Sequence, residues 1–136
     1  MNDFLIHPRL AADAIELGQW PLCRLLLMND GRFPWLILVP ARRDTREIYD
    51  LAAPDRILLI EEIAQASALM QKAFRADKMN VAALGNQVPQ LHIHVIARFL
   101  GDPAWPNRVW VHTLARLMTE AEQAERIARL QPLIAP

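Results

Sequence analysis

Short apolar runs, separated by turn-forming residues, dominate the first forty positions of the chain. Leu22–Met28 is apolar except for Arg24, and Trp35–Val39 is apolar throughout. Between these runs lies an Asp-Gly pair within Asn29–Arg32, and such a pair is typical of a hairpin turn. Proline has no amide hydrogen to donate to a neighbouring strand. We therefore expect a β-hairpin whose second strand ends at Pro40.

Three other segments repeat apolar residues at three- and four-residue steps, which is the period of an amphipathic helix. The longest begins at Pro54 and runs to Arg75, with acidic residues early and basic residues late, an order that complements the helix dipole. A second covers Leu114–Leu130. A short pattern from Pro8 to Leu17 predicts a further helix that ends before Gly18.

Two more strands are expected in the second half of the chain, at Met79–Leu84 and Leu91–Ala97. A tight turn at Gly85–Gln87 joins them, and the proline-containing Asp102–Asn107 reads as a loop. Hairpins combined with separate helices favour an α+β fold with an antiparallel sheet. The 136 residues fit a single domain, 1–136.

Composition narrows the class of protein. Apolar residues make up 53% of the chain, and 15 basic residues balance 15 acidic ones. A neutral chain is not expected to bind nucleic acid or an acidic membrane surface, although a small phosphorylated ligand needs only a few local donors. We also expect no signal peptide and no transmembrane span, because the first residues lack a basic region and no long apolar window occurs.

The single cysteine, Cys23, cannot form an internal disulfide, so we expect a reducing, cytoplasmic location. It lies inside an apolar run and is expected to be a buried, unreactive side chain.

Polar and apolar residues alternate in the stretch Gln87–Arg98. Side chains on a strand alternate between its two faces. One face would therefore carry Gln90, His92 and His94. The other face would carry three apolar residues that favour burial: Leu91, Ile93 and Val95.

Three interpretations of this polar face are open. In the first, the histidines are solvated and inert. In the second, they form half of a metal site, which would need a third ligand such as His7, His112 or a carboxylate. Neither His7 nor His112 stands at a sequence spacing from His92 and His94 that is diagnostic of a metal site. The sequence also completes no recognised zinc-binding pattern. His7, which precedes a proline at a helix start, is better explained as a helix-capping or surface residue.

In the third interpretation one histidine performs phosphoryl chemistry and the other polar groups hold a phosphate. Histidine is able to attack phosphorus and has a free lone pair near neutral pH. Gln90, His94 and Asn86 carry side-chain donors, and the turn at Gly85–Gln87 adds backbone amides. This convergence at one end of one strand favours phosphoryl chemistry over a metal.

Asn80–Arg98 resembles the signature of the histidine triad (HIT) superfamily of nucleotide hydrolases and transferases, His-φ-His-φ-His-φ-φ with φ apolar. The similarity extends to the hairpin Leu22–Pro40 and the helix after Pro54, and covers about residues 3–100; the loop and helix of 101–136 are less typical. The resemblance implies an antiparallel sheet of about five strands with a long helix packed on it and a further C-terminal helix. It also implies a homodimer that binds a small nucleotide and requires no cofactor or metal.

Matched residue by residue, the resemblance implies a role for each motif position. His92 takes the catalytic place and attacks the α-phosphorus to form a nucleotidyl-histidine. The expected phosphate-binding residues are Gln90, His94, Asn86 and Gln87. The expected nucleoside-binding residues, by a weaker match, are Asn29, Asp30 and Asn80. Asn29 and Asp30 also have a simpler explanation, because a tight Asn-Asp-Gly turn favours these residues.

Two positions depart from the family pattern. Gln90 replaces the first histidine, and Ala97 replaces the usual proline. Glutamine does not titrate but keeps a donor and an acceptor. We therefore expect a nucleotide hydrolase or transferase, of the phosphoramidase or dinucleoside polyphosphate hydrolase type. The alternatives are a nucleotide-binding protein with little turnover and, from the metal interpretation, a metal-dependent hydrolase using His92 and His94.

Two other groups have open roles. Trp105 and Trp110 follow the motif and are expected to pack in the structure, with walls of a base pocket as the alternative. Arg42, Arg43 and Arg46 form a basic cluster that is expected to be a solvated loop, with contact to a polyphosphate as the alternative.

Overall fold

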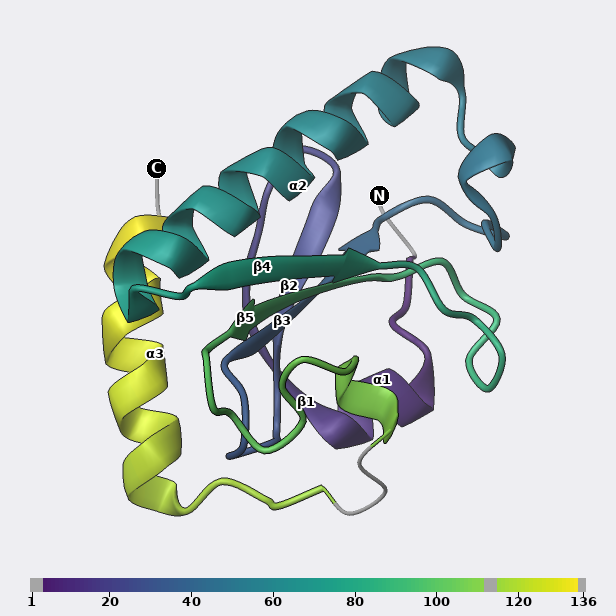
Figure 1. Cartoon of the computed structure of the whole chain (residues 1–136). Coiled ribbons are helices and arrows are strands. Elements are labelled where there is room, and N and C mark those ends of the chain that lie inside the picture. Colours follow the sequence, from purple (N-terminus) through teal and green to yellow (C-terminus); the bar gives the residue numbers. More distant parts are fainter. Residues whose placement is uncertain (1–3, 112–114, 135–136) are drawn as a thin grey trace.

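The computed structural model describes residues 4–111 and 115–134 of the chain. Its elements follow the order α1 (Pro8–Asp13), β1 (Ala14–Gln19), β2 (Cys23–Met28), β3 (Trp35–Pro40), the 3-10 turn η1 (Ile48–Asp50), α2 (Ala53–Phe74), β4 (Lys78–Ala82), β5 (Ile93–Arg98), the 3-10 turn η2 (Val109–Val111) and α3 (Glu120–Ile134) (Figure 1). The expected α+β fold, its hairpin and its long helix are confirmed.

The five strands form one antiparallel sheet in the order β1-β2-β3-β5-β4. Strand β5, which carries the second histidine of the motif, therefore lies between β3 and β4. Ile37 of β3 pairs with His94, and Ala82 of β4 pairs with His94 from the other side. A residue in this position is held by neighbours on both sides, so the motif is built on a rigid part of the sheet.

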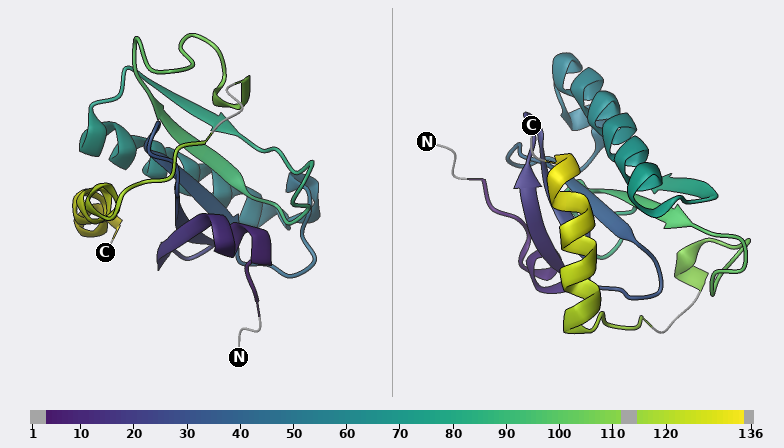
Figure 2. Two further views of the ribbon diagram at one scale, coloured as in Figure 1. Left: turned by 90° about the horizontal axis from the view of Figure 1, so that it is seen from below. Right: turned by 90° about the vertical axis from the view of Figure 1, so that its left-hand side faces the viewer.

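Both faces of the sheet are covered. Helix α2 packs on one face, and α3 lies beside β1 and one end of α2 (Figure 2). The core on this side contains Leu91, Ile93 and Val95 of the motif together with Leu59 and Met70 of α2. The expected burial of this apolar face is confirmed, and it leaves His92 and His94 on the opposite face.

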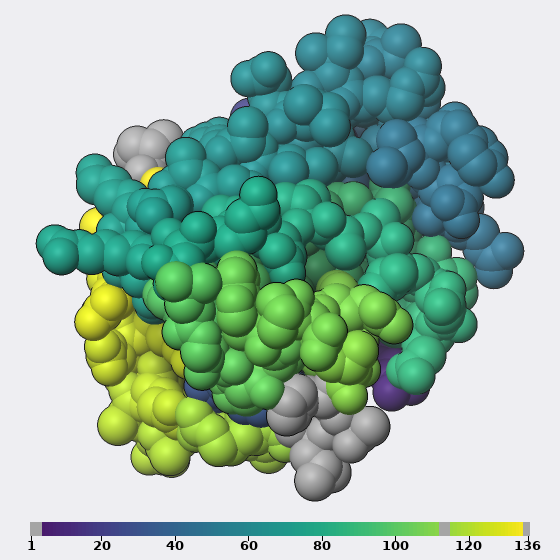
Figure 3. Space-filling model, in the orientation of Figure 1, coloured from purple at the N-terminus to yellow at the C-terminus, as the bar shows by residue number. Residues whose placement is uncertain are grey.

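The second face is covered by the N-terminal segment and by the segment that follows β5. Its apolar core combines Phe4 and Leu10 with Ile37 of β3, Ile96 of β5 and Val109 of η2. In the space-filling view the segment after β5 spreads over this side of the molecule (Figure 3). These two segments therefore cover the sheet face that carries the histidines, and the face is not open to solvent.

The helix expected over Pro8–Leu17 is wrong in its second half. Helix α1 ends at Asp13, and the chain continues as the edge strand β1. Pairing with β2 buries Leu17 in the α2 core and leaves Glu16 at the surface, where it contacts Arg24. This gain of sheet hydrogen bonds and apolar burial outweighs a local helical pattern only ten residues long.

The last helix begins later than the Leu114–Leu130 pattern suggests; Leu114 itself lies outside the described residues. Thr119 and Glu122 form a reciprocal cap, in which the Glu122 amide donates to Thr119 Oγ1 at 3.1 Å and the Thr119 amide donates to Glu122 Oε1 at 2.9 Å. This capping box fixes the start of α3. The sequence signal for it, Thr-x-x-Glu, stands at 119–122.

The paired carboxylate of Asp102 organises the segment after β5. Arg98, whose side chain is 2% exposed, donates to both Asp102 oxygens at 2.8 and 2.9 Å. These contacts, with the backbone amides of Phe99 and Ala104 that also donate to Asp102, lower the pKa of the carboxyl group to about 2 despite the opposing effect of its partial burial. The segment that leads to Trp110 is therefore anchored to β5 by a charged network.

Within the described residues no helix is long and apolar enough to span a bilayer. Cys23 is fully buried, and burial raises the pKa of its thiol, as expected for an unreactive side chain.

Candidate functional site

His92 lies immediately before β5 and is only 5% exposed. Its Nδ1 atom lies 2.7 Å from the backbone oxygen of Gln90. A carbonyl oxygen only accepts, so Nδ1 carries the proton and donates it, and the lone pair remains on Nε2. Burial lowers the pKa of His92, which keeps the ring neutral at pH 7. Such an imidazole is equipped to act as a nucleophile or base through Nε2.

His94 has the opposite tautomer. The indole Nε1 of Trp35 donates to Nδ1 of His94 at 3.0 Å, so in the neutral ring the proton sits on Nε2. Burial, with a smaller effect from His92, lowers the pKa of His94 to about 3. The two rings lie 4.9 Å apart between centroids. The pair therefore combines one nitrogen with a free lone pair and one N–H donor.

Trp110 of η2 packs edge-on against the same group. Its ring centroid lies 5.0 Å from His94 and 5.6 Å from Trp35. Trp110 remains 37% exposed and lines the pocket beside the histidines. Trp105, by contrast, packs over the Arg98 guanidinium at 5.7 Å. The two tryptophans thus differ, since only Trp110 reaches the site.

Two pockets meet at His92. The apolar pocket has a volume of about 400 Å³ and also contains His94. Its apolar wall is formed by Leu10, Met28, Ile37, Leu84, Val88 and Trp110, and its polar rim by Arg9, Asp13, Asn86 and Gln87. The polar pocket has a volume of about 520 Å³. It is lined by Arg46, Glu47, Ile48, Tyr49, Ala83, Leu84, Gly85, Asn86, Pro89, Gln90, Leu91 and His92.

The expected phosphate-binding turn lies where the two pockets join. Asn86 lines both pockets, Gln87 lines the apolar pocket, and Gly85 lines the polar pocket. The structure therefore brings His92, His94, Asn86 and Gln87 together around one space.

The Gln90 side chain forms its hydrogen bonds with the N-terminal segment. Its Oε1 accepts from the His7 amide at 2.8 Å, and its Nε2 donates to the Leu5 oxygen at 2.9 Å. Both functional groups of the amide thus bind the N-terminal segment, which leads into α1 and the wall of the apolar pocket. Gln90 reaches His92 through its backbone oxygen.

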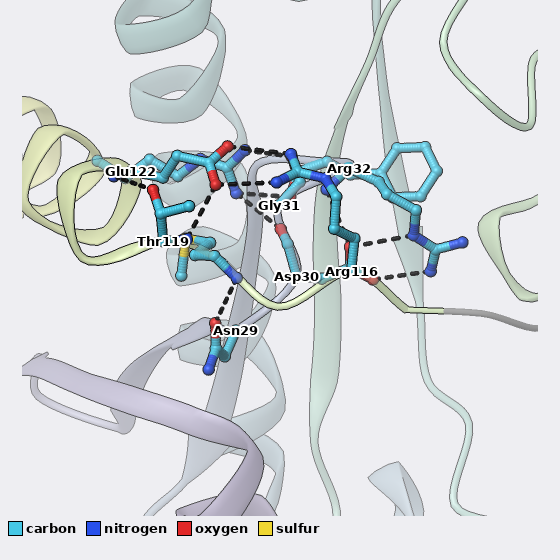
Figure 4. Close-up of polar contacts among 10 residues, drawn as sticks. Asn29, Asp30, Gly31, Arg32, Arg116, Thr119 and Glu122 are labelled. Atoms are coloured by element: carbon cyan, nitrogen blue, oxygen red, sulfur yellow. Dashed lines mark hydrogen bonds and ion pairs between the residues drawn. The ribbon is translucent and has the colours of Figure 1, made fainter.

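The hairpin residues expected to bind a nucleoside are held by the C-terminal segment (Figure 4). Oδ1 of Asn29 accepts from the Met118 amide at 2.9 Å, and the Asp30 carboxylate binds Arg32 at 2.8 Å. Neither Asn29 nor Asp30 lines a pocket at His92. Their observed contacts fit the turn-forming explanation, because the Asp30 carboxylate also accepts from the Arg32 amide two residues on.

Asn80 is likewise separated from His92. Its Oδ1 accepts from Arg98 at 2.8 Å, and it lines a third pocket with Val81 and Trp110. Two other polar residues on the rim of the apolar pocket, Arg9 and Asp13, belong to α1 and were not singled out by the sequence. They carry no motif, and only the packing of α1 on the sheet brings them there.

The candidate metal ligands do not assemble in the described part of the chain. His7 caps α1, with its Nδ1 accepting from the Arg9 amide at 3.1 Å, as expected for a helix-capping residue. His112 lies outside the described residues. Within residues 4–111 and 115–134, no three His, Cys, Asp or Glu side chains group closely enough to hold a metal ion.

Comparison with known proteins identifies a matching domain family and similar solved structures. The HIT domain model matches residues 9–101. A crystal structure of a histidine triad protein from Sinorhizobium meliloti 1021 has a TM-score of 0.94 at 44% identity, covering 98% of this chain and 99% of that one. A histidine triad protein from Bradyrhizobium japonicum has a TM-score of 0.94 at 41% identity, with coverage of 97% and 98%.

A third structure, a histidine triad protein from Marinobacter aquaeolei VT8, has a TM-score of 0.93 at 51% identity and covers 96% of both chains. The search of curated proteins found no match. The matching domain includes the whole motif strand and both histidines described above. The chain belongs to the histidine triad (HIT) family, which includes nucleotide hydrolases and transferases.

Proposed function

We propose that this protein is a nucleotide hydrolase or nucleotidyl transferase that acts through a covalent intermediate on His92. The observation that carries the proposal is the tautomer of this ring. Its Nδ1 is occupied by the Gln90 carbonyl at 2.7 Å, so Nε2 holds the lone pair in a ring that is kept neutral by burial. The substrate class is a nucleoside phosphoramidate or a dinucleoside polyphosphate.

In the first step Nε2 of His92 forms a bond to the α-phosphorus, and the bond from phosphorus to the leaving group breaks. The leaving group departs with the bonding electron pair, and a leaving group that is an amine also takes up a proton from solvent. In the second step water, or another hydroxyl acceptor, forms a bond to phosphorus and releases its proton to solvent, while the P–N bond to His92 breaks and its electron pair returns to Nε2. The histidine is regenerated, and the product is a monophosphate or a transferred nucleotide.

The Gln90 carbonyl has a defined task in this reaction. The imidazole becomes positively charged when Nε2 bonds to phosphorus, and the hydrogen bond from Nδ1 to the carbonyl oxygen then becomes charge-assisted. The interaction is stronger in the intermediate than in the free protein, which is the condition for lowering a barrier. The backbone supplies this acceptor, so the reaction does not need a titrating side chain at position 90.

The remaining donors surround the phosphate. His94 offers Nε2–H, fixed in that tautomer by Trp35, and Asn86 and Gln87 offer amide groups at the junction of the pockets. The apolar pocket suits the base and ribose, because it combines an aliphatic wall and Trp110 with the polar rim at Arg9 and Asp13.

A steady-state assay tests the proposal. Wild-type protein is mixed with a fluorogenic adenosine phosphoramidate or a dinucleoside polyphosphate, with and without EDTA. We expect turnover that survives chelation and is lost in His92→Ala, while His7→Ala retains it. Nucleotide binding without turnover would favour the binding-protein alternative. If EDTA abolishes turnover of the phosphoramidate, which is supplied without metal, the result would instead favour a metal-dependent hydrolase.

We also propose that the protein is a homodimer. Strand β4 is an edge of the sheet, and Val81 and Leu84 beside it are 47% and 42% exposed. An open sheet edge with exposed apolar side chains can pair with or pack against a second chain. Light scattering of the wild type and of Val81→Lys tests this, with a dimer expected only for the wild type.

A further inference from the structure

The polar pocket beside His92 is not used by the nucleoside and phosphate assigned above. It shares His92, Leu84 and Asn86 with the apolar pocket and extends from them toward η1. A substrate whose phosphorus lies at His92 has two parts, the nucleoside and the leaving group. The apolar wall suits the base, which leaves the polar pocket, with a volume of about 520 Å³, next to the reacting bond.

The segment that lines this pocket is fixed to the motif by backbone hydrogen bonds. The Leu91 amide donates to the Thr45 oxygen at 2.9 Å, directly before His92. The amides of Arg46 and Glu47 both donate to Asp50 Oδ2, at 3.1 and 3.0 Å. These bonds close the turn and place its side chains in a defined position relative to the reactive histidine.

The charges on this segment are distributed unevenly. Arg42 is paired with Asp55 at 2.7 Å. The guanidinium of Arg46 forms no hydrogen bond or ion pair with any residue of the described chain, and it lines the pocket. Tyr49 lines the same pocket with 78% of its surface exposed, so its ring is open to contact. An unpaired cation and an open aromatic ring therefore border the pocket that adjoins His92.

We propose that the polar pocket is the leaving-group subsite and that it selects an anionic leaving group, a phosphate or polyphosphate chain that binds Arg46. A ring attached to that chain would stack on Tyr49. This inference rests on the proposed function, because it names the group that departs when His92 attacks. The departing oxygen gains negative charge as the P–O bond breaks, so a guanidinium at this place assists the departure of a phosphate more than that of a neutral amine.

Glu47 supplies a matched control, because it carries the opposite charge on the same turn and lines the same pocket. Arg46→Gln and Glu47→Gln each remove one charge and keep the backbone bonds to Asp50. Each variant is assayed on two substrates with the same base: diadenosine tetraphosphate and an adenosine phosphoramidate whose leaving group is a neutral amine.

We expect Arg46→Gln to lower kcat/KM for the tetraphosphate by about 10- to 100-fold, the range for loss of one hydrogen bond to a charged group. Its kcat/KM for the phosphoramidate should stay within about twofold of the wild type. Glu47→Gln should not lower either value. Equal losses on both substrates for Arg46→Gln, or no loss on either, would overturn the assignment.

A binding measurement separates this inference from the proposed function. If the wild type turns over neither substrate, nucleotidyl transfer fails, and the subsite is then tested by calorimetric titration with AMP and with diadenosine tetraphosphate. Arg46→Gln should weaken binding of the tetraphosphate and leave the affinity for AMP unchanged. Equal effects on the two ligands, or none, would show that Arg46 does not contact a leaving group.

Discussion

The indole nitrogen of Trp35 donates a hydrogen bond of 3.0 Å to Nδ1 of His94, across neighbouring strands of the sheet. Both side chains are buried, at 4% and 7% exposure, so water does not compete for this bond. The contact leaves Nε2 as the protonated nitrogen of His94, in a ring that lines the apolar pocket.

Replacing Trp35 with Phe keeps an aromatic ring but removes the donor. The buried Nδ1 acceptor of His94 then loses its partner, and we expect the free energy of unfolding to fall by about 1–3 kcal/mol in urea titration. Nitrogen-15 NMR should show the Nε2–H tautomer of His94 in the wild type and a mixture in the variant. The KM for nucleotide should rise.

Trp20→Phe is the matched control for this variant. The Trp20 indole donates to the Ile134 oxygen at 3.1 Å, in a buried position far along the chain from the motif. It should lose a similar amount of stability without a change in KM or in the His94 tautomer. If both variants raise KM equally, Trp35 acts on the fold alone.

The pH dependence of kcat/KM reports the protonation of His92. Burial favours the neutral ring and lowers the pKa of His92 in the folded protein. The nucleophilic form therefore persists below the ordinary histidine pKa of about 6.5. We therefore expect the acid limb of kcat/KM to have its midpoint below about 6.5. An acid limb with its midpoint at or above about 6.5 would contradict this.

Gln90 is expected to act as an anchor for the N-terminal segment. Gln90→Ala removes the bonds to His7 and Leu5, each worth about 1 kcal/mol. We expect faster proteolysis near the N-terminus and a higher KM with a smaller change in kcat. Gln87→Ala, which leaves these two bonds intact, is the control for proteolysis.

Gln90→His tests the same residue in the opposite direction. Restoring the family's usual histidine should not produce a large gain in rate, because the amide at this position holds backbone groups and the Nδ1 acceptor of His92 is a carbonyl. A large gain would show that the natural chain is a weakened enzyme.

Arg126 joins α3 to the hairpin turn. Its guanidinium donates to the backbone oxygens of Asp30, Phe33 and Gly31 at 2.8, 3.1 and 2.9 Å. Arg126→Gln should lower the free energy of unfolding by about 1–3 kcal/mol, since three partly buried acceptors lose a charged donor. Arg129→Gln, on the exposed side of the same helix, should cost less than about 1 kcal/mol. Similar losses in thermal or urea unfolding would contradict the role of Arg126.

The sequence predicted the parts of the fold that depend on local pattern. The hairpin, the helix after Pro54 and the two faces of the motif strand are confirmed, because alternation and turn residues determine them over short distances. Strand β1 was missed because its identity depends on pairing with β2 and on burial of Leu17 against the α2 core. A pattern of ten residues does not contain that information.

For the candidate site, too, the sequence predicted the local arrangement but not the long-range contacts. The motif placed His92, His94 and Asn86 at one end of a strand, and the structure brings them together. The partners of Gln90 lie 83 and 85 residues earlier, and the partner of Asn29 lies 89 residues later. Such contacts depend on tertiary packing. Motif spacing therefore predicted which residues gather at the pockets, but not that the Gln90 and Asn29 side chains bind distant parts of the chain.

Trapping of the intermediate on His92 tests covalent nucleotidyl transfer directly. Wild-type protein is mixed for milliseconds with substrate, quenched in alkaline denaturant to preserve a P–N bond, and analysed by peptide mass spectrometry. We predict an adduct of one nucleoside monophosphate on the peptide that contains His92, absent in His92→Asn. Turnover by the wild type with no adduct at any time, or with the adduct on another residue, would contradict the covalent role of His92.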